Sequence, residues 1–333
     1  MSKNINDTEL LEHLVESKIN FIKEISKTVI GQKDILDQML IALLTRGHTL
    51  LVGVPGLAKT LLIKSMAEIC DLSFKRIQFT PDLMPSDITG TELIDIDPET
   101  EQRNFRFFKG PIFGNIILAD EINRTPPKTQ AALLEAMQEN KVTAGGHTHD
   151  LDKPFFVLAT QNPIEQEGTY PLPEAQLDRF MFQLWVDYPT FDQEKQIIIQ
   201  TTSSSSVNSH AQMNKDDILQ YQELIREVPI PSSVLDYTVS LVNCTRPNAD
   251  NNKSKNNSIA NEYLSWGAGP RASQNLILAA KSKAMSEGRF NITEEDIKFL
   301  AVPVLRHRII PNYTAEAQGL SSVDIVDKIL SIL

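Results

Sequence analysis

The chain has few cysteines, no long apolar run and no excess of basic residues, and each shortage excludes a class of protein. Its two cysteines, Cys70 and Cys244, cannot form a disulfide framework and fit a reducing compartment. No stretch approaches the roughly 18 uninterrupted apolar residues of a membrane helix, and we expect no signal peptide. We therefore predict no membrane span and expect a cytoplasmic protein.

The charge balance is acidic, with 32 Lys and Arg against 43 Asp and Glu and a net charge of −11. A surface that binds a nucleic-acid duplex usually needs a basic patch. We therefore do not expect nucleic acid as the default partner, although a small basic pore lining can lie within an acidic whole. The length of 333 residues and the hydrophobic content of 41% predict two domains, each with its own core.

A glycine-containing loop is the most informative feature that is present. The loop is Gly53-Val-Pro-Gly-Leu-Ala-Lys59-Thr60, between an apolar run at 49–52 and a helical pattern at 61–69. Backbone N–H groups of such a loop bind phosphate oxygens, a Lys reaches the β- and γ-phosphates, and a Thr hydroxyl holds Mg²⁺. The strict pattern has glycine where Ala58 stands, which adds a Cβ close to the phosphate. The alternative is a simple turn between strand and helix.

Two adjacent carboxylates end a second predicted strand at residues 115–120. Ligands of an open parallel sheet bind beyond the carboxyl ends of its strands, so Asp120 can hold the Mg²⁺ of a nucleotide bound at Lys59. Glu121 can then orient and deprotonate the attacking water, which distinguishes an ATPase from a protein that only binds nucleotide. The alternative is a capping pair at the start of a helix.

A third predicted strand places another polar residue at the same edge, and two arginines stand at the ends of other elements. Asn162 comes directly after the strand predicted at 155–160 and can align the water against the γ-phosphate, or it can be a turn residue before Pro163. Arg179 ends a short helix, and Arg271 begins a later one. An arginine can stabilise the charge of a transferring phosphoryl group and can come from a neighbouring subunit, whereas an isolated arginine is more often a surface residue or an ion-pair partner.

These motifs together resemble the MoxR family of AAA+ ATPases, and the resemblance spans nearly the whole chain. The motifs are Val29-Ile-Gly-Gln32, Gly53 to Thr60, Ile117 to Glu121, Ala159 to Pro163, Leu177-Asp-Arg-Phe180 and Gly269-Pro-Arg271. In that family Ala before the Lys is usual, so Ala58 becomes a family marker. The resemblance implies that the nucleotide contacts Ile30, Gly31, Gly53, Pro55, Gly56, Leu57, Ala58, Lys59, Thr60 and Leu61.

The same resemblance assigns roles to the polar residues. It implies that Asn162 is sensor 1, that Arg271 is sensor 2, and that Arg179 is the finger that reaches a neighbour's nucleotide. Arg124, which closely follows the acidic pair, is a competing finger.

The alternation of strands and helices predicts an α/β fold. Strands near 49–52, 74–79, 115–120, 155–160 and 181–186 predict a five-stranded parallel sheet, and helical patterns follow at 217–227, 232–243, 272–286 and 293–305. The resemblance implies that the sheet is the AAA+ P-loop core, in a domain at residues 1–189 that includes an N-terminal amphipathic helix, and that residues 190–333 are a small all-α lid. Residues 201–206 and 248–261 read as flexible or mobile loops.

Two segments interrupt this alternation. Residues 80–114 are long for a connection and, by the resemblance, contain an insertion in the second helix region; residues 141–150 read as a hairpin around Gly145-Gly146. Such insertions face a central pore in related machines, or are surface decoration. His147 and His149 have no accompanying set of acidic or cysteine ligands, so we read them as surface residues.

The resemblance implies an ATPase that converts ATP and water to ADP and phosphate, with Mg²⁺, in a ring that the family suggests is a hexamer. It further implies a chaperone-like role on a client protein, with a von Willebrand factor A domain protein as a candidate partner. The alternatives are a nucleic-acid-linked motor, a metal-chelatase motor subunit and a nucleotide-gated scaffold that does not hydrolyse ATP.

Overall fold

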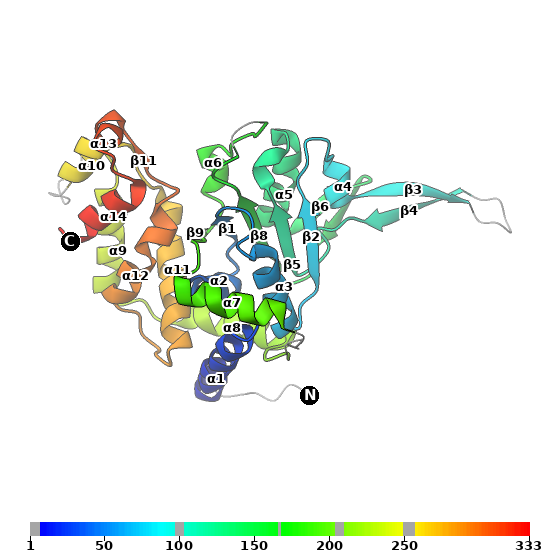
Figure 1. The fold of residues 1–333 in the computed structure, drawn as a ribbon, viewed down its shortest axis with the longest axis horizontal. Coiled ribbons are helices and arrows are strands. Elements are labelled where there is room, and N and C mark those ends of the chain that lie inside the picture. Colours follow the sequence, from blue (N-terminus) through cyan, green and yellow to red (C-terminus); the bar gives the residue numbers. More distant parts are fainter. Residues whose placement is uncertain (1–6, 97–102, 166–167, 204–209, 249–256) are drawn as a thin grey trace.

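A five-stranded parallel sheet forms the centre of the first half of the chain. The computed structural model describes residues 7–96, 103–165, 168–203, 210–248 and 257–333 (Figure 1). The strands lie in the order β2-β5-β8-β1-β9, and every neighbouring pair is parallel. Their bounds are β1 Thr49–Val52, β2 Phe74–Gln78, β5 Ile116–Asp120, β8 Phe156–Gln161 and β9 Phe182–Trp185. The predicted five-stranded sheet is confirmed.

Helices cover both faces of this sheet because alternate strand residues are apolar on either side. In β5, Ile116 and Leu118 belong to one buried cluster, whereas Ile117 and Ala119 belong to another. The helices of this half are α1 Asp7–Ile25, α2 Lys33–Leu44, α3 Lys59–Ile69, the 3₁₀ turn η1 Ile122–Arg124, α5 Pro127–Glu139 and α6 Glu174–Leu177. No helix among the described residues is both long and apolar enough to cross a membrane.

Two antiparallel hairpins extend from the core. Residues 80–114 contain the short helix α4 Pro85–Thr89 and the pair β3 Gly90–Ile96 and β4 Arg103–Lys109, which projects away from the body in Figure 1. The predicted hairpin at 141–150 is confirmed as β6 Lys141–Ala144 and β7 His147–Asp150. The Phe107 ring of β4 stacks on His149 of β7 with 4.2 Å between ring centroids. His149 therefore packs the two hairpins against each other.

The second half is largely helical. Its helices are α7 Phe191–Thr202, α8 Lys215–Glu227, α9 Ser232–Cys244, α10 Ser258–Tyr263, α11 Pro270–Ser286, α12 Glu294–Leu305, α13 Tyr313–Ala317 and α14 Ser322–Leu330. This half also contains a small antiparallel pair of strands, β10 Leu264–Trp266 and β11 Ile310–Pro311. The prediction of an all-α lid did not include these two strands. These strands are too short to show a period of two in the sequence.

The two predicted loops of this half need partial correction. Residues 201 and 202 end α7, and residues 258–261 begin α10, so neither segment is a loop throughout. Residues 203, 248 and 257 lie outside helices, and the rest of each segment, at 204–206 and 249–256, lies outside the described residues.

The N-terminal helix joins the two halves. It contacts α3 of the first half and both α8 and α11 of the second. The Tyr221 hydroxyl of α8 lies 2.6 Å from His13 Nδ1 and 3.1 Å from Ser17 Oγ of α1. Through these contacts α1 packs against elements on both sides of the predicted domain boundary at 189/190. The position of that boundary stays a prediction.

Candidate nucleotide site

A cavity of about 350 Å³ lies at the carboxyl edge of the sheet. Because β5, β8 and β1 are adjacent and parallel, the residues that follow them meet there. The structure thus brings together residues that the sequence analysis selected separately from three strands. The lining residues are Pro55, Gly56, Leu57, Ala58, Lys59, Thr60, Asp120, Glu121, Thr160 and Asn162.

The backbone of the loop after β1 explains its unusual residues. Gly56 has a φ of +85°, and Ala58 is left-handed with a φ of 53° although it carries a Cβ. Gly53 lies close to β9, where an added Cβ would stand 2.8 Å from the Val186 carbonyl oxygen. The loop therefore needs glycine at 53 for space and tolerates strain at 58, immediately before α3 begins at Lys59.

Lys59 provides the positive charge of the cavity. Its ammonium donates to the carbonyl oxygen of Gly53 and to that of Val54, the latter over 3.1 Å. Burial lowers the pKa of Lys59, while the nearby carboxylates of Asp120 and Glu121 oppose this shift. The Lys59 amine is thus half-buried against the loop, and we expect the phosphates of a nucleotide to bind the same loop.

Asp120 is held from two neighbouring strands. The Thr160 hydroxyl of β8 donates to Oδ1 over 2.6 Å, and Arg76 of β2 donates to Oδ2 over 2.7 Å. A carboxylate has about four acceptor positions, so lone pairs remain for a metal ion. Mg²⁺ is usually held by one or two carboxylates together with substrate phosphates. The carboxylate of Asp120 and the hydroxyl of Thr60, in one cavity, therefore fit Mg²⁺.

Glu121 has a strained backbone and a restrained side chain. Its φ is 57°, a conformation that a residue with a side chain rarely adopts, and its N–H donates to the Thr160 hydroxyl over 2.8 Å. Oε2 accepts Gln78 Nε2 over 2.9 Å and Arg124 Nη1 over 3.0 Å. Among the described residues Oε1 makes no hydrogen bond. One carboxylate oxygen is thus fixed and the other remains available.

Asn162 is a turn residue that also lines the cavity. Its Oδ1 accepts the Ile164 N–H over 3.2 Å, as in a turn, and the residue also lines the cavity. The turn fixes the side chain beside the carboxylates. Its role toward water stays a prediction.

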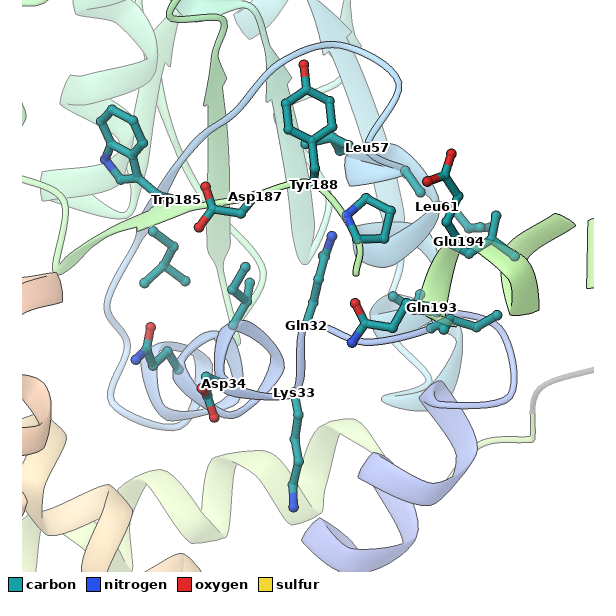
Figure 2. A pocket seen from close by; sticks show the side chains of 18 of the residues that line it. Gln32, Lys33, Asp34, Leu57, Leu61, Trp185, Asp187, Tyr188, Gln193 and Glu194 are labelled. Carbon is teal, nitrogen blue, oxygen red and sulfur yellow. The ribbon is translucent and has the colours of Figure 1, made fainter. Parts of the chain in front are cut away.

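A second, larger cavity of about 1060 Å³ also includes Gly56, Leu57 and Ala58 of the loop. Figure 2 shows that its side chains come from the segment before α2 and its start (Gln32, Lys33, Asp34), the loop and α3 (Leu57, Leu61), the end of β9 (Trp185, Asp187, Tyr188) and α7 (Gln193, Glu194). Ile30 also lines it. Phe299, Val302, Pro303 and Arg306 contribute from α12 and the residue that follows it. A nucleoside in this cavity would therefore touch both halves of the chain.

Two residues of the predicted nucleotide-binding set line neither cavity. Gly31 turns the chain with a φ of +77°, and an added Cβ there would lie 2.8 Å from the side chain of Gln193. Gly53 packs on Val186, as described above. Both glycines shape the backbone around the cavities.

The two proposed arginines also lie outside both cavities. Arg271, at the start of α11, donates from Nη1 to Asp178 Oδ2 over 3.2 Å. Arg179 has no side-chain hydrogen bond or ion pair among the described residues. Arg124, the competing finger, is instead engaged within its own chain by Glu121 and, at 3.8 Å, by Glu165.

Sequence reasoning missed several residues of the site. Thr160 reads as an ordinary strand residue, and Arg76 and Gln78 lie on a strand with no recognised motif. Gln78 is in register with Asp120, so only the pairing of β2 with β5 places these side chains beside the carboxylates. Arg308, which follows α12, was also missed: burial lowers its pKa to about 10, while Asp178 opposes that shift.

Comparisons with known proteins agree with the fold described above. Residues 48–182 match the model of the ATPase family associated with various cellular activities (AAA), and residues 256–329 match the AAA lid domain. The Bacillus subtilis protein YeaC, named as uncharacterized, is 42% identical over 93% of this chain and 92% of its own length. The Mycobacterium tuberculosis protein named Chaperone MoxR1 is 41% identical over 93% of this chain and 80% of its own.

A solved structure of a candidate ATPase from Cytophaga hutchinsonii has a TM-score of 0.88 at 43% identity, over 98% of this chain and 96% of that one. The fold and the site therefore define an AAA domain followed by its lid. Both cavities lie where the loop after β1 meets neighbouring segments, as expected for this class. Within the class, the chain belongs to the MoxR family of AAA+ ATPases.

Proposed function

We propose that this chain binds ATP with Mg²⁺ and hydrolyses it to ADP and phosphate. The observation that carries the proposal is that Lys59 and Thr60 share one 350 Å³ cavity with Asp120, Glu121 and Asn162. This set combines a cation for phosphate, oxygen ligands for a hard metal ion, and a carboxylate with an amide for water.

Each residue of the cavity has a separate task in this proposal. Lys59 and the loop N–H groups bind the β- and γ-phosphates. Thr60 and Asp120 would hold Mg²⁺, which when bound neutralises phosphate charge. The remaining residues of the predicted set, from Ile30 to Leu61, shape the two cavities.

Glu121 is the proposed general base. Gln78 and Arg124 hold its Oε2, so Oε1 can accept a proton from a water that Asn162 aligns. The water oxygen forms a bond to the γ-phosphorus, the bond from that phosphorus to the leaving oxygen of ADP breaks, and the proton passes to Glu121. ADP and inorganic phosphate are the products.

The arginines extend the proposal to more than one subunit. Arg271 would contact the γ-phosphate from the lid, and Arg179 would reach the nucleotide of a neighbouring copy. A finger acting on the next copy is a heterologous contact that closes into a ring, and the family suggests a hexamer. The absence of a partner for Arg179 among the described side chains supports this assignment over Arg124.

The work of the ATPase is proposed to be remodelling or maturation of a client protein. The name of the relative Chaperone MoxR1 supports this role. A von Willebrand factor A domain protein is the candidate partner, and a cytoplasmic location stays a prediction. A nucleic-acid-linked motor is the runner-up, and stimulation of ATP turnover by DNA would favour it.

The test is Mg-ATP turnover per subunit over a wide range of protein concentration, with Glu121→Gln as the control for contaminating ATPase. Turnover that rises with concentration supports a trans arginine and ring assembly. A turnover rate per subunit that does not change with concentration, and that is lost in Glu121→Gln, indicates either a ring that is already assembled or a site that is complete within one chain. The mass of the protein in solution then distinguishes these two cases. If the unmodified chain turns over no faster than Glu121→Gln, the hydrolysis proposal for the isolated chain is rejected.

A further inference from the structure

Asp178 lies between α6 and β9 and directly precedes Arg179. Its Oδ1 accepts Arg308 Nε over 2.7 Å, and its Oδ2 accepts Arg271 Nη1 over 3.2 Å. A single carboxylate thus joins the proposed sensor arginine of the lid to the segment that carries the proposed finger.

The two arginine contacts of Asp178 differ in burial and in the number of hydrogen bonds that support them. The Arg308 side chain is only 1% exposed, and its four other N–H groups donate to the carbonyl oxygens of Asp178, Phe180, Met181 and Val304. The Arg271 side chain is 43% exposed and, within the described part of the chain, makes this one ion pair. A buried, fully bonded guanidinium is a fixed anchor, whereas a solvated single contact is weak and readily exchanged.

The charges of this cluster also favour exchange. Two guanidinium groups, those of Arg271 and Arg308, share the single carboxylate of Asp178, and Arg308 already takes one of its oxygens. The excess positive charge leaves room for a further anion. A terminal phosphate, which carries more charge than a carboxylate, can compete for Arg271.

We propose that Asp178 is a positioning residue that holds Arg271 away from the phosphate cavity until ATP binds. The inference rests on the proposed function, in which Arg271 contacts the γ-phosphate. When Arg271 moves to ATP, Asp178 keeps only the Arg308 anchor, and the backbone of Arg179 loses its link to the first turn of α11. The finger offered to the neighbouring copy thereby responds to the nucleotide in its own subunit.

The test compares Asp178→Asn with the unmodified chain in calorimetric titrations with β,γ-imido-ATP and with ADP. Asn retains an acceptor for Arg308 Nε but loses the charge that holds Arg271. We expect about two- to fivefold tighter binding of the ATP analogue, the scale of an exposed ion pair, and unchanged binding of ADP. The substitution should have no effect in an Arg271→Ala background, and Asp178→Glu should retain the affinities of the unmodified chain.

The outcomes separate this inference from the proposed function. An equal change for both nucleotides, or a change that persists without Arg271, means that Asp178 acts only through stability and overturns the inference. If the unmodified chain binds neither nucleotide, the proposed function is rejected and this inference with it. If it binds both, Lys59→Ala abolishes binding, and Asp178→Asn leaves the ratio of affinities unchanged, this inference alone is rejected.

Hydrogen exchange on the unmodified chain gives a second test that does not depend on how Asp178→Asn folds. The amides of Arg179 and Phe180 are hydrogen-bonded to the carbonyls of Gln176 and Leu177, so their exchange can be followed. The ATP analogue, and not ADP, should change the exchange of these two amides, and the change should be absent in Arg271→Ala. Unchanged exchange at both amides would overturn the inference.

Discussion

The Thr160 hydroxyl donates its hydrogen to Asp120 Oδ1 over 2.6 Å, and the hydroxyl oxygen of Thr160 accepts the backbone N–H of Glu121 over 2.8 Å. One buried hydroxyl on β8 therefore holds the carboxylate of Asp120 and the backbone of Glu121. This makes Thr160 a test of how precisely the cavity must be arranged.

Thr160→Val keeps the shape of the side chain and removes this hydroxyl. We expect ATP turnover to fall about tenfold or more because the Asp120 carboxylate and the Glu121 backbone each lose a positioning contact. We expect the free energy of unfolding to fall by about 1–3 kcal/mol because buried polar groups lose their partner. Steady-state kinetics and urea unfolding measure the two effects. Thr160→Ser is the matched control and should retain most of both; unchanged turnover in Thr160→Val would contradict the assignment.

Ala58→Gly should stabilise the chain. Ala58 has a φ of 53°, where a Cβ is strained, so we expect a gain of about 0.5–1 kcal/mol after allowing for the greater freedom of glycine in the unfolded chain. Ala131→Gly is the control, because Ala131 is exposed within α5 and glycine there should cost about 1 kcal/mol. Urea midpoints that move in the same direction for both variants would refute the strain at Ala58.

Gly53→Ala should lower the stability of the fold, because the packing around Gly53 leaves no space for a Cβ. The added Cβ would stand 2.8 Å from the carbonyl oxygen of Val186, so β1 and β9 must shift, at a cost of about 1–3 kcal/mol. Gly269→Ala is the control, because nothing lies within 4 Å of a Cβ at that position. Thermal unfolding of both variants measures the difference, and equal melting temperatures would show that the loop relaxes without strain.

Mixed rings can distinguish the two candidate fingers. Lys59→Ala and Arg179→Ala should each be inactive alone, whereas an equal mixture should recover up to about a quarter of the activity, because some interfaces combine an intact site with an intact finger. Arg124 pairs with Glu121 of its own chain, so a mixture of Lys59→Ala with Arg124→Ala should recover none. Recovery with Arg124→Ala and none with Arg179→Ala would reverse the assignment.

The lid should lose stability in acid through Asp296. Burial raises the pKa of this carboxyl, but hydrogen bonds from Arg289, Thr293 and Lys283 outweigh burial, so its folded pKa lies below the ordinary value of 3.8. A depressed folded pKa means that the contribution is complete above the unfolded pKa and is lost as pH falls through the folded pKa.

Asp296→Asn isolates this effect. The variant should be less stable than the unmodified chain by about 1–3 kcal/mol at pH 7, and the difference should shrink below about pH 4. Glu295→Gln, on the same turn, removes an exposed carboxylate and should change little at any pH. Unfolding free energies measured at several pH values check the prediction; a difference that stays constant down to pH 2 would contradict it.

The sequence predicted the sheet and the centre of the site because each depends on local patterns. Apolar runs of four to six residues ending in a loop or a carboxylate identified β1, β5 and β8. Parallel strands end at one edge, so the positions of the motifs along the chain were enough to place Lys59, Asp120 and Asn162 together. The motifs also indicated the family, which the comparisons then confirmed.

Contacts between distant segments could not be predicted in this way. Gln78 and Arg76 hold the carboxylates only because β2 pairs with β5 in one particular register, and Arg308 reaches Asp178 across 130 residues of chain. The strands β10 and β11 are likewise defined by each other rather than by their own sequence.

By itself, therefore, the sequence determined the five strands of the sheet, their order along the chain and the chemical groups of the cavity, because backbone propensity and side-chain period are local properties. The tertiary structure alone decided which side chains restrain those groups and which partner Arg271 takes. Those choices depend on strand register and on packing between residues far apart in the chain, whose hydrogen bonds and ion pairs form only when these distant segments come together.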